Sequence, residues 1–404
     1  MAETVPKQPR GLRVTVMMLT TLTILSGATI APALPSIAEA FADLRDAQFL
    51  AKTLLTLPAF VIAVLGPVSG WLIDRLGRLK LLVVGLVLYA LGGASGYWLD
   101  DLYLILAGRA VLGVGVAIVM TVTTTLVGDY FKGAARHRFL GIQGGFTLIG
   151  GIVFVGTGGV LADLDWRYPF LLYLVSLPLI FLVFTRLYEP PHGRVQLERN
   201  ADGELQPVSY SKKMISLIYA ITFVYMLIFY IIPVQIPFLF EELGILSDTK
   251  KGLAIVVGTA SAAVTAFLYP RLRARLHYGR IYSVGFSIIA VGYALVSFAD
   301  GFWTVIGALV IAGLGVGVLM PNANLWVLSI VPERSRGKAL GFLTTALFLG
   351  QFGSPFFLQP FVYFFGLQEA FLWVALVLVA LSVGFWVIEF EDTEKRAVAK
   401  AVRA

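Results

Sequence analysis

The stretch GWLIDRLGRLK, residues 70–80, is a short basic interruption between two long apolar runs. The run before it covers approximately residues 49–72, and the run after it covers residues 79–99. A helix rises about 1.5 Å per residue, so about twenty apolar residues cross a hydrocarbon core of about 30 Å. The sequence therefore predicts two membrane-spanning helices that are joined by a basic turn around Gly77.

Ten further apolar runs bring the predicted number of spans to twelve. They cover residues 14–36, 102–128, 139–162, 168–187, 214–240, 252–270, 281–299, 302–330, 339–365 and 370–388. The chain is 58% apolar and 14% charged, whereas soluble domains are about 45–50% apolar and about 25% charged. The sequence therefore predicts an all-α membrane protein. Pro32 and Pro35 predict that the first run is a retained helix with a bent outer end.

The basic residues lie mainly on one side of the predicted spans. Of the 31 Lys and Arg residues, only Arg109 lies well inside a span, and only five lie on the predicted outer side. Those five are Arg45, Lys52, Arg167, Lys250 and Lys251. Because basic residues collect on the cytoplasmic side, both termini are expected in the cytoplasm. The net charge of +7 then lies against anionic lipid headgroups, and no nucleic-acid partner is needed to explain it.

An internal repeat is visible in short motifs. Gly113-Val114-Gly115 recurs as Gly315-Val316-Gly317, and Gly77-Arg78 recurs as Gly279-Arg280, both 202 residues later. A third match, between residues 136–141 and residues 336–341, has a displacement of 200 residues. Six spans separate the copies, so both halves enter the membrane in the same direction and are parallel repeats. The predicted organisation is a six-helix bundle over residues 1–187, a polar cytoplasmic linker over 188–213, and a second six-helix bundle over 214–404.

Residues 70–80 fit the pattern G-x-L-x-D-R-x-G-R-x-K at every defined position. This pattern resembles the loop signature of the major facilitator superfamily, which implies that family's fold and alternating-access transport. The resemblance implies that Asp74 faces the start of the eleventh helix, residues 335–338, and latches the two halves. It also implies a charge network that joins Arg75 and Arg78 to Asp129. Gly70 allows another helix to approach closely.

Two further stretches resemble motifs of the same family. RAVLGVGVA, residues 109–117, is similar to its fourth-helix motif, in which the Arg participates in coupling. The glycine-rich fifth span resembles the signature of the drug:proton antiporter branch, and it keeps the Gly158-Gly159 pair. However, Phe154-Val155 stands where that branch has Gly-Pro. The departure weakens the antiporter assignment.

Arg109 is the charged residue whose position needs the most explanation. An Arg in the middle of a membrane costs at least about 2.5 kcal/mol, so it either faces the protein interior or a watery cavity, or reaches outward to the headgroups. Both alternatives remain open from the sequence. Lys52 lies close to the start of the second span, and we expect its side chain to reach outward.

Neutral polar side chains supply the other candidates for the substrate path. They are Gln143, Tyr225, Gln235, Asn322, Asn324 and Gln351. Helix-to-helix hydrogen bonding is an equal alternative for each of them. Pro233, Pro237 and Pro321 are expected to break their helices and release backbone carbonyls near these residues.

No acid lies deep inside a predicted span. Proton coupling would therefore use a peripheral acid, namely Asp129, Asp74, Glu39 or Glu241, together with Arg109. The three His residues are all cytoplasmic and Cys is absent, so the sequence predicts no cofactor, metal site or catalytic residue.

These features predict a secondary transporter of the bacterial cytoplasmic membrane that exports small amphipathic compounds in exchange for protons. The expected partners are a small-molecule substrate, the proton and membrane lipid, and the chain is expected to act as a monomer. The first alternative is uptake or facilitated diffusion of a small polar or anionic solute by the same fold. A membrane-embedded receptor or enzyme is a second alternative, for which no intramembrane nucleophile or metal site is seen.

Overall fold

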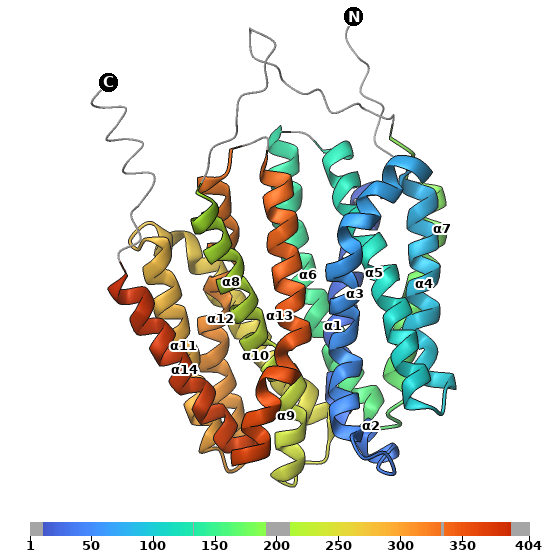
Figure 1. Ribbon diagram of the computed structural model, residues 1–404. Helices are drawn as coiled ribbons and strands as arrows, with labels where there is room; N and C mark the ends of the chain where they lie inside the picture. The colour runs from blue at the N-terminus through green and yellow to red at the C-terminus, as the bar shows by residue number, and fades with distance from the viewer. Residues whose placement is uncertain (1–10, 132, 191–210, 333–334, 389–404) are drawn as a thin grey trace, which may run out of the picture. The chain divides into compact units, whose positions relative to one another are not determined.

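The computed structural model describes residues 11–131, 133–190, 211–332 and 335–388, and these form helices without strands. Twelve helical segments are long and apolar enough to cross a membrane, as predicted. The chain divides into two compact units, Met1–His192 and Gly193–Ala404. In each unit the long helices run roughly side by side (Figure 1). The dividing point falls within the predicted linker, whose residues 191–210 lie outside the described part of the chain.

The first unit contains the first six spans. Its elements are α1 (Leu12–Ala28), η1 (Ala31–Ala33), α2 (Leu34–Ala40), α3 (Ala47–Leu76), α4 (Arg78–Trp98), α5 (Leu102–Tyr130), α6 (Gly133–Ala162), η2 (Tyr168–Val175) and α7 (Ser176–Arg186). The predicted bend of the first span is confirmed, because a 3-10 turn containing Pro32 separates α1 from α2. The helix α5 packs against α3 and α4 and forms the centre of the unit.

The second unit contains the last six spans. Its elements are α8 (Lys212–Phe229), α9 (Ile231–Glu242), α10 (Asp248–Arg273), α11 (Tyr278–Ser297), α12 (Phe302–Ile330), α13 (Arg336–Phe365) and α14 (Leu367–Val387). The seventh span is interrupted at Tyr230, just before Pro233, as expected, but α9 continues through Pro237, where a break was also expected. The expected break at Pro321 is wrong, because α12 continues through it. A proline removes only one backbone donor, and packing against neighbouring helices can hold the flanking turns in place.

Glycines set the spacing of the central helix in both units. A Cβ on Gly115 of α5 would lie 2.6 Å from the backbone N of Tyr89, and one on Gly315 of α12 would lie 2.5 Å from the carbonyl O of Gly285. Only glycine, which has a hydrogen in place of Cβ, fits at these two positions, and it lets the backbones of the packed helices approach closely. The carbonyl O of Gly85 would lie 2.8 Å from the same Cβ on Gly115.

These contacts correct the register of the repeat. Gly115 and Gly315 have equivalent neighbours and are 200 residues apart, and α5 and α12 begin at Leu102 and Phe302. The structural displacement is therefore 200 residues in this region, whereas the matching Gly-Val-Gly letters suggested 202. The sequence match is misleading because α5 and α12 each carry glycines two residues apart, so more than one alignment pairs a glycine with a glycine.

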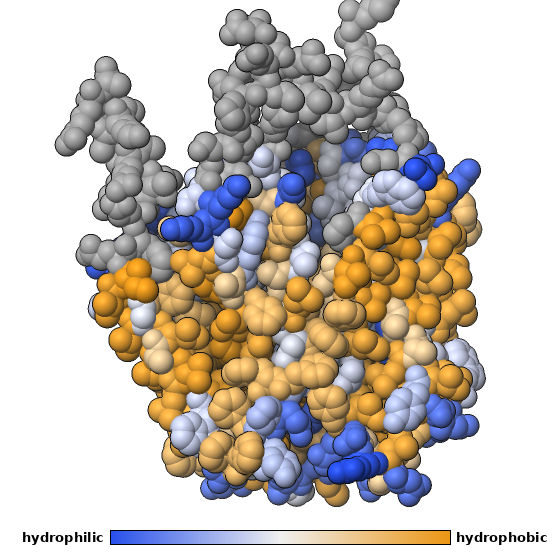
Figure 2. All heavy atoms as spheres, viewed as in Figure 1, coloured by the Kyte–Doolittle hydropathy of each residue, from blue (hydrophilic) through white to orange (hydrophobic). Residues whose placement is uncertain are grey.

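The sides of both units are apolar. Large hydrophobic side chains such as Phe181, Phe267 and Trp386 are exposed on them. On the face in view, hydrophobic residues cover the sides of the helices and hydrophilic residues collect at their ends (Figure 2). Because lipid rather than water covers such a surface in a membrane, this pattern is typical of a multi-pass membrane protein.

Candidate functional site

Arg109 lies in the interior of the first unit. The side chain is fully buried on α5. Its Nε donates to the carbonyl O of Leu54 on α3 at 2.8 Å, and Nη2 donates to the carbonyl O of Ser26 on α1 at 3.0 Å. Its Cζ lies 5.1 Å from the ring centre of Tyr173. Between the two alternatives left open by the sequence, the structure places this residue inward, so it does not reach the headgroups.

The guanidinium of Arg109 keeps one nitrogen available. Nη1 is buried and has no hydrogen-bond partner among the described residues, and neither has the hydroxyl of Tyr173. Within that part of the chain, no carboxylate forms an ion pair with Arg109. A buried charged group without a full set of partners is costly. Because no described residue accepts from Nη1, this nitrogen can donate a hydrogen bond to a ligand or to a water molecule.

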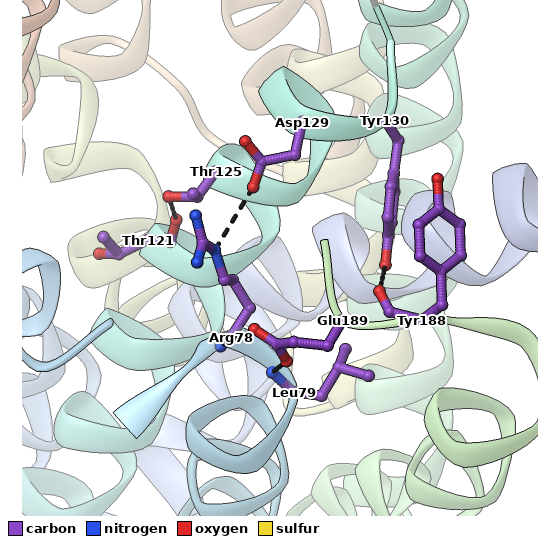
Figure 3. A network of polar contacts seen from close by, with 8 residues as sticks. All are labelled: Arg78, Leu79, Thr121, Thr125, Asp129, Tyr130, Tyr188 and Glu189. Atoms are coloured by element: carbon purple, nitrogen blue, oxygen red, sulfur yellow. Dashed lines mark hydrogen bonds and ion pairs between the residues drawn. The ribbon is translucent and has the colours of Figure 1, made fainter. Parts of the chain in front are cut away.

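The loop that carries the family-like signature joins a polar network at one end of the first unit (Figure 3). Arg78 Nε lies 3.4 Å from Asp129 Oδ2, so the two form an ion pair, although the contact is not a hydrogen bond. Arg75 does not join them, because its guanidinium lies over the ring of Trp71 at 3.9 Å. The network implied by the resemblance is thus present for Arg78 and Asp129.

Glu189 completes this network and was not predicted from the sequence. Its two carboxylate oxygens accept from the backbone N of Arg78 at 2.7 Å and of Leu79 at 2.9 Å (Figure 3). A carboxylate at this position caps the free amides at the start of α4. Gly77 has a φ of 83°, and a Cβ there would lie 3.2 Å from Glu189 Oε1. The lack of a Cβ on Gly77 therefore permits the carboxylate of Glu189 to lie close to the start of α4.

A tyrosine holds the same segment from the other side. The hydroxyl of Tyr130, the last residue of α5, donates to the carbonyl O of Tyr188 at 2.6 Å. Tyr188 and Glu189 follow α7 and begin the predicted linker. The start of the linker is thus fixed to the signature loop and to the end of α5. The only sequence signal for Glu189 was the position of an acidic residue two residues after an apolar span, and such residues are too common to be diagnostic.

Two residues of the predicted latch have no described contacts. The backbone of Asp74 lies in the last turn of α3, but its side chain is outside the described part of the structure. Nothing lies within 4 Å of a Cβ built on Gly70. The predicted contact of Asp74 with the start of α13 therefore remains a prediction.

The neutral polar candidates differ in how their hydrogen bonds are satisfied. Gln235 on α9 is fully buried, and neither its Oε1 nor its Nε2 has a partner among the described residues. Asn322 on α12 is equally buried, but it accepts from the Tyr269 hydroxyl at 3.1 Å and donates to the Tyr278 carbonyl O at 3.0 Å. The geometry therefore favours helix-to-helix hydrogen bonding for Asn322. For Gln235 it favours a partner that is not part of the described chain, such as a bound small molecule or water.

The remaining candidates give weaker indications. Tyr225 and Gln351 are buried in the second unit, and Asn324 is half-buried. The Oε1 of Gln143 on α6 is buried without a hydrogen-bond partner among the described residues. These four positions stay candidates by location alone.

Two lysines lie elsewhere than the sequence predicted. Lys52, which was expected to reach outward, is only 3% exposed on α3. Lys251, which was assigned to an outer loop, lies in the first turn of α10 and is fully buried. For Lys251, the helix α10 begins at Asp248, before the predicted span at residue 252, so a residue that hydropathy assigns to a loop lies on the helix. Lys52 already lay inside the predicted span of residues 49–72, and only the burial of its side chain was not predicted. Among the described residues, no three His, Cys, Asp or Glu side chains are grouped to hold a metal ion.

The fold and these buried polar groups define a multi-pass membrane protein of the transporter class. The family model described as Major Facilitator Superfamily matches residues 16–233 and 218–404. The two matches cover most of the chain, so the protein belongs to the Major Facilitator Superfamily and is a transporter rather than an enzyme.

Among curated relatives, the chain is 23% identical over 398 residues to a class H tetracycline resistance protein from Pasteurella multocida. That match covers 95% of this chain and 98% of the relative. The chain is also 24% identical over 356 residues to a bacillibactin exporter from Bacillus subtilis, and this match covers 82% of the chain and 85% of the relative.

Solved structures show the same fold. A D-xylose-proton symporter superposes with a TM-score of 0.75 at 16% identity, covering 93% of this chain and 97% of the symporter. A bacterial homolog of the human lysosomal transporter Spinster, in an inward-facing unoccupied conformation, gives 0.75 at 16% identity, with coverage of 93% and 95%. At such identities the likeness concerns the fold alone.

Proposed function

We propose that the protein is a proton-coupled exporter of small amphipathic organic compounds in the bacterial cytoplasmic membrane, with both termini in the cytoplasm. The observation that carries the proposal is similarity along nearly the whole chain to two relatives whose names describe resistance and export. The distribution of basic residues supports the orientation. The acting unit in this proposal is a single chain.

The buried polar groups support a site for small molecules. An unsatisfied buried amide or guanidinium nitrogen costs about 1–3 kcal/mol, so Gln235 and Arg109 favour a state in which something binds them. Apolar surroundings with a few polar groups are typical of small-molecule sites. We therefore assign Arg109 in the first unit and Gln235 in the second as substrate-contacting or coupling residues.

A second candidate function is uptake of a small polar or anionic solute. The available Nη1 of Arg109 favours it, because a buried guanidinium binds anions well. The departure at Phe154-Val155 from the exporter signature also favours it. The direction of net transport separates the two functions.

A resistance screen tests the proposal. The chain is expressed in a bacterium that lacks its major efflux pumps, and growth is measured against a broad panel of toxic compounds. We expect raised tolerance to at least one amphipathic compound, and a protonophore should abolish the lowered cell content of that compound. Accumulation that increases on expression would favour uptake and contradict export.

The signature loop gives a further prediction. We propose that Asp74, with Arg75 and Arg78, stabilises one conformation of the transporter. Asp74→Asn should reduce transport while insertion and thermal stability remain close to those of the parent, because the change shifts a conformational balance. Transport and membrane yield are measured together. Unchanged transport in D74N would contradict the latch.

A further inference from the structure

The turn between α10 and α11 is strongly basic. Residues 271–280 contain four arginines and one histidine, and they contain no acidic residue. Arg271, Arg275 and Arg280 are exposed, and none of them forms an ion pair within the described part of the chain. We call residues 271–280 the α10–α11 basic turn. The positive charge of these three side chains is therefore not compensated by a described carboxylate.

The corresponding turn of the first half is compensated by acids. At a displacement of 200 residues it covers residues 71–80, which include Asp74. Arg78 forms an ion pair with Asp129, and Glu189 accepts from two backbone amides at the start of α4. The first half thus supplies carboxylates at this turn from its own chain.

Two of these acids have no acidic counterpart in the second half. Ala274 stands in the place of Asp74, and Ser329 stands in the place of Asp129. The hydroxyl of Ser329 donates to a backbone carbonyl O of its own helix at 2.8 Å. The basic character of the turn is therefore repeated in the second half, whereas these two acids are not.

An exposed aromatic ring holds one of the arginines at the side of the helices. Arg280 lies in the first turn of α11, and its Cζ is 5.5 Å from the ring centre of Trp386 in the last turn of α14. The helices α11 and α14 pack side by side (Figure 1). Trp386 is 60% exposed. A guanidinium is attracted to the face of an indole ring, and its N–H groups stay available for an anion.

The surface next to this pair is apolar. Val379, Val383 and Val387 of α14 are between 48% and 70% exposed. They are four residues apart, so they follow one face of the helix toward its end. Lipid acyl chains cover apolar side chains of this kind, and headgroup phosphates lie at the level of the helix ends. The surface therefore combines a contact for an acyl chain with a contact for an anion.

We propose that the α10–α11 basic turn, together with Trp386, binds the headgroup of an anionic phospholipid whose acyl chains lie against α14. The phosphate supplies negative charge at a turn where the first half uses carboxylates, and guanidinium groups bind phosphate oxygens well. Basic pockets at the cytoplasmic ends of membrane helices bind anionic headgroups in this way. The proposed orientation places the turn in the cytoplasmic leaflet, and the binding does not depend on the direction of transport.

Fluorescence quenching with a single cysteine tests the proposal. The chain contains no Cys, so Val383→Cys on α14 can carry one fluorophore. The full chain is placed in phosphatidylcholine nanodiscs that contain nitroxide-labelled phosphatidylglycerol or, at the same mole fraction, nitroxide-labelled phosphatidylcholine. The ratio of the two quenching constants gives the preference for the anionic headgroup. We expect this ratio to be clearly above one.

A second reporter separates a site from a general attraction of the basic membrane face. Phe184→Cys lies on α7, the corresponding helix of the first half, and Phe184 is also exposed. We expect a smaller preference for phosphatidylglycerol at this reporter than at residue 383. Equal preferences at the two reporters would overturn the proposal, because the whole basic face would then attract anionic lipid alike.

Two matched charge changes test the role of Arg280. Arg280→Gln should lower the preference at residue 383 about fivefold, because a basic residue near the membrane surface contributes about 1 kcal/mol. Lys80→Gln removes one charge at the equivalent exposed position of the first half and should leave the preference at residue 383 unchanged. The same loss in R280Q and K80Q, or no loss in R280Q, would overturn the proposal.

Two other sources of negative charge are distinguished in the same assay. Glu389, Glu391 and Asp392 follow α14 and lie outside the described residues. If they occupy the turn, the parent shows no preference and a variant with Gln, Gln and Asn at these positions gains one, which overturns the proposal. An unchanged preference in that variant supports lipid binding. Excess inorganic phosphate should compete no better than sodium chloride of equal ionic strength, and specific competition by phosphate would identify an ion site instead.

Discussion

The two halves share a scaffold but bury different polar groups. In both, a central helix packs through a glycine against the third helix of its half. In both, a tyrosine of that third helix donates to the first helix, from Tyr89 to the Leu22 carbonyl O at 2.8 Å and from Tyr293 to the Ile228 carbonyl O at 2.6 Å. Yet Arg109 of the first half corresponds to Leu309 in the second, and at the same displacement Phe41, Gln48 and Ala51 of the first half stand where Glu241, Asp248 and Lys251 form ion pairs in the second. The helix contacts are therefore repeated in the two halves, whereas these polar and charged side chains are not.

The largest expected effect concerns the ion pairs of Lys251 with Glu241 and Asp248 in the second half. Lys251→Met removes the ammonium that pairs with the buried Asp248 and with Glu241, which should destabilise the protein by about 3–5 kcal/mol. The thermal midpoint in one detergent measures this. Lys250→Met, which loses only a contact near the Phe302 ring, should change stability by about 0.5 kcal/mol or less. Equal midpoints for the two variants would mean that the ion pairs of Lys251 do not stabilise the second half.

The next prediction sharpens the register of the repeat. Gly115→Val and Gly315→Val should each destabilise by about 1–3 kcal/mol, because the new side chain meets backbone atoms. The control is Gly144→Ala, since nothing lies within 4 Å of a Cβ there. Thermal unfolding of the three variants is compared. A tolerated valine at either position would show that the two central helices are not spaced alike.

A third comparison separates a binding group from a structural one in the second half. Asn322→Leu leaves the Tyr269 hydroxyl and the Tyr278 carbonyl without a partner, so stability should fall by about 1–3 kcal/mol. Gln235→Leu removes an amide that has no partner, so stability should stay equal or rise while transport falls. Melting curves and flux are measured on both variants. A strong loss of stability in Q235L would identify Gln235 as structural.

The smallest expected effect concerns Tyr89 and Tyr293, which make similar hydrogen bonds although they are not at equivalent positions of the repeat. Tyr89→Phe and Tyr293→Phe each lose one hydrogen bond inside the membrane, which should cost about 0.6 kcal/mol. The two losses should be equal within error when measured by thermal unfolding. A large difference would show that one half depends on its tyrosine for more than helix packing.

The sequence predicted the scaffold well because hydropathy and length determine which segments cross a membrane. The twelve spans and the bend at Pro32 follow from such local patterns. The register of the repeat does not follow from them, because glycines two residues apart give several matching alignments. Only the contacts of Gly115 and Gly315 distinguish them.

The candidate site was predictable only in part. Arg109 and Gln235 could be singled out because polar residues inside apolar runs are rare. Glu189 and Lys251 could not, because their roles depend on partners that are distant in sequence or assigned to a loop. The partner of Glu189 at the start of α4 is 111 residues away. Whether a buried polar group has hydrogen-bond partners, as Asn322 does, depends on other helices and cannot be predicted from a single sequence.

Flux across a defined membrane tests the central claim most directly. The purified protein is placed in liposomes, and a pH gradient of either sign is imposed while movement of a compound identified by the resistance screen is followed. We expect the compound to move against its own gradient, in the direction opposite to the protons, and a protonophore should stop it. Movement that is the same with and without the pH gradient would contradict proton-coupled export.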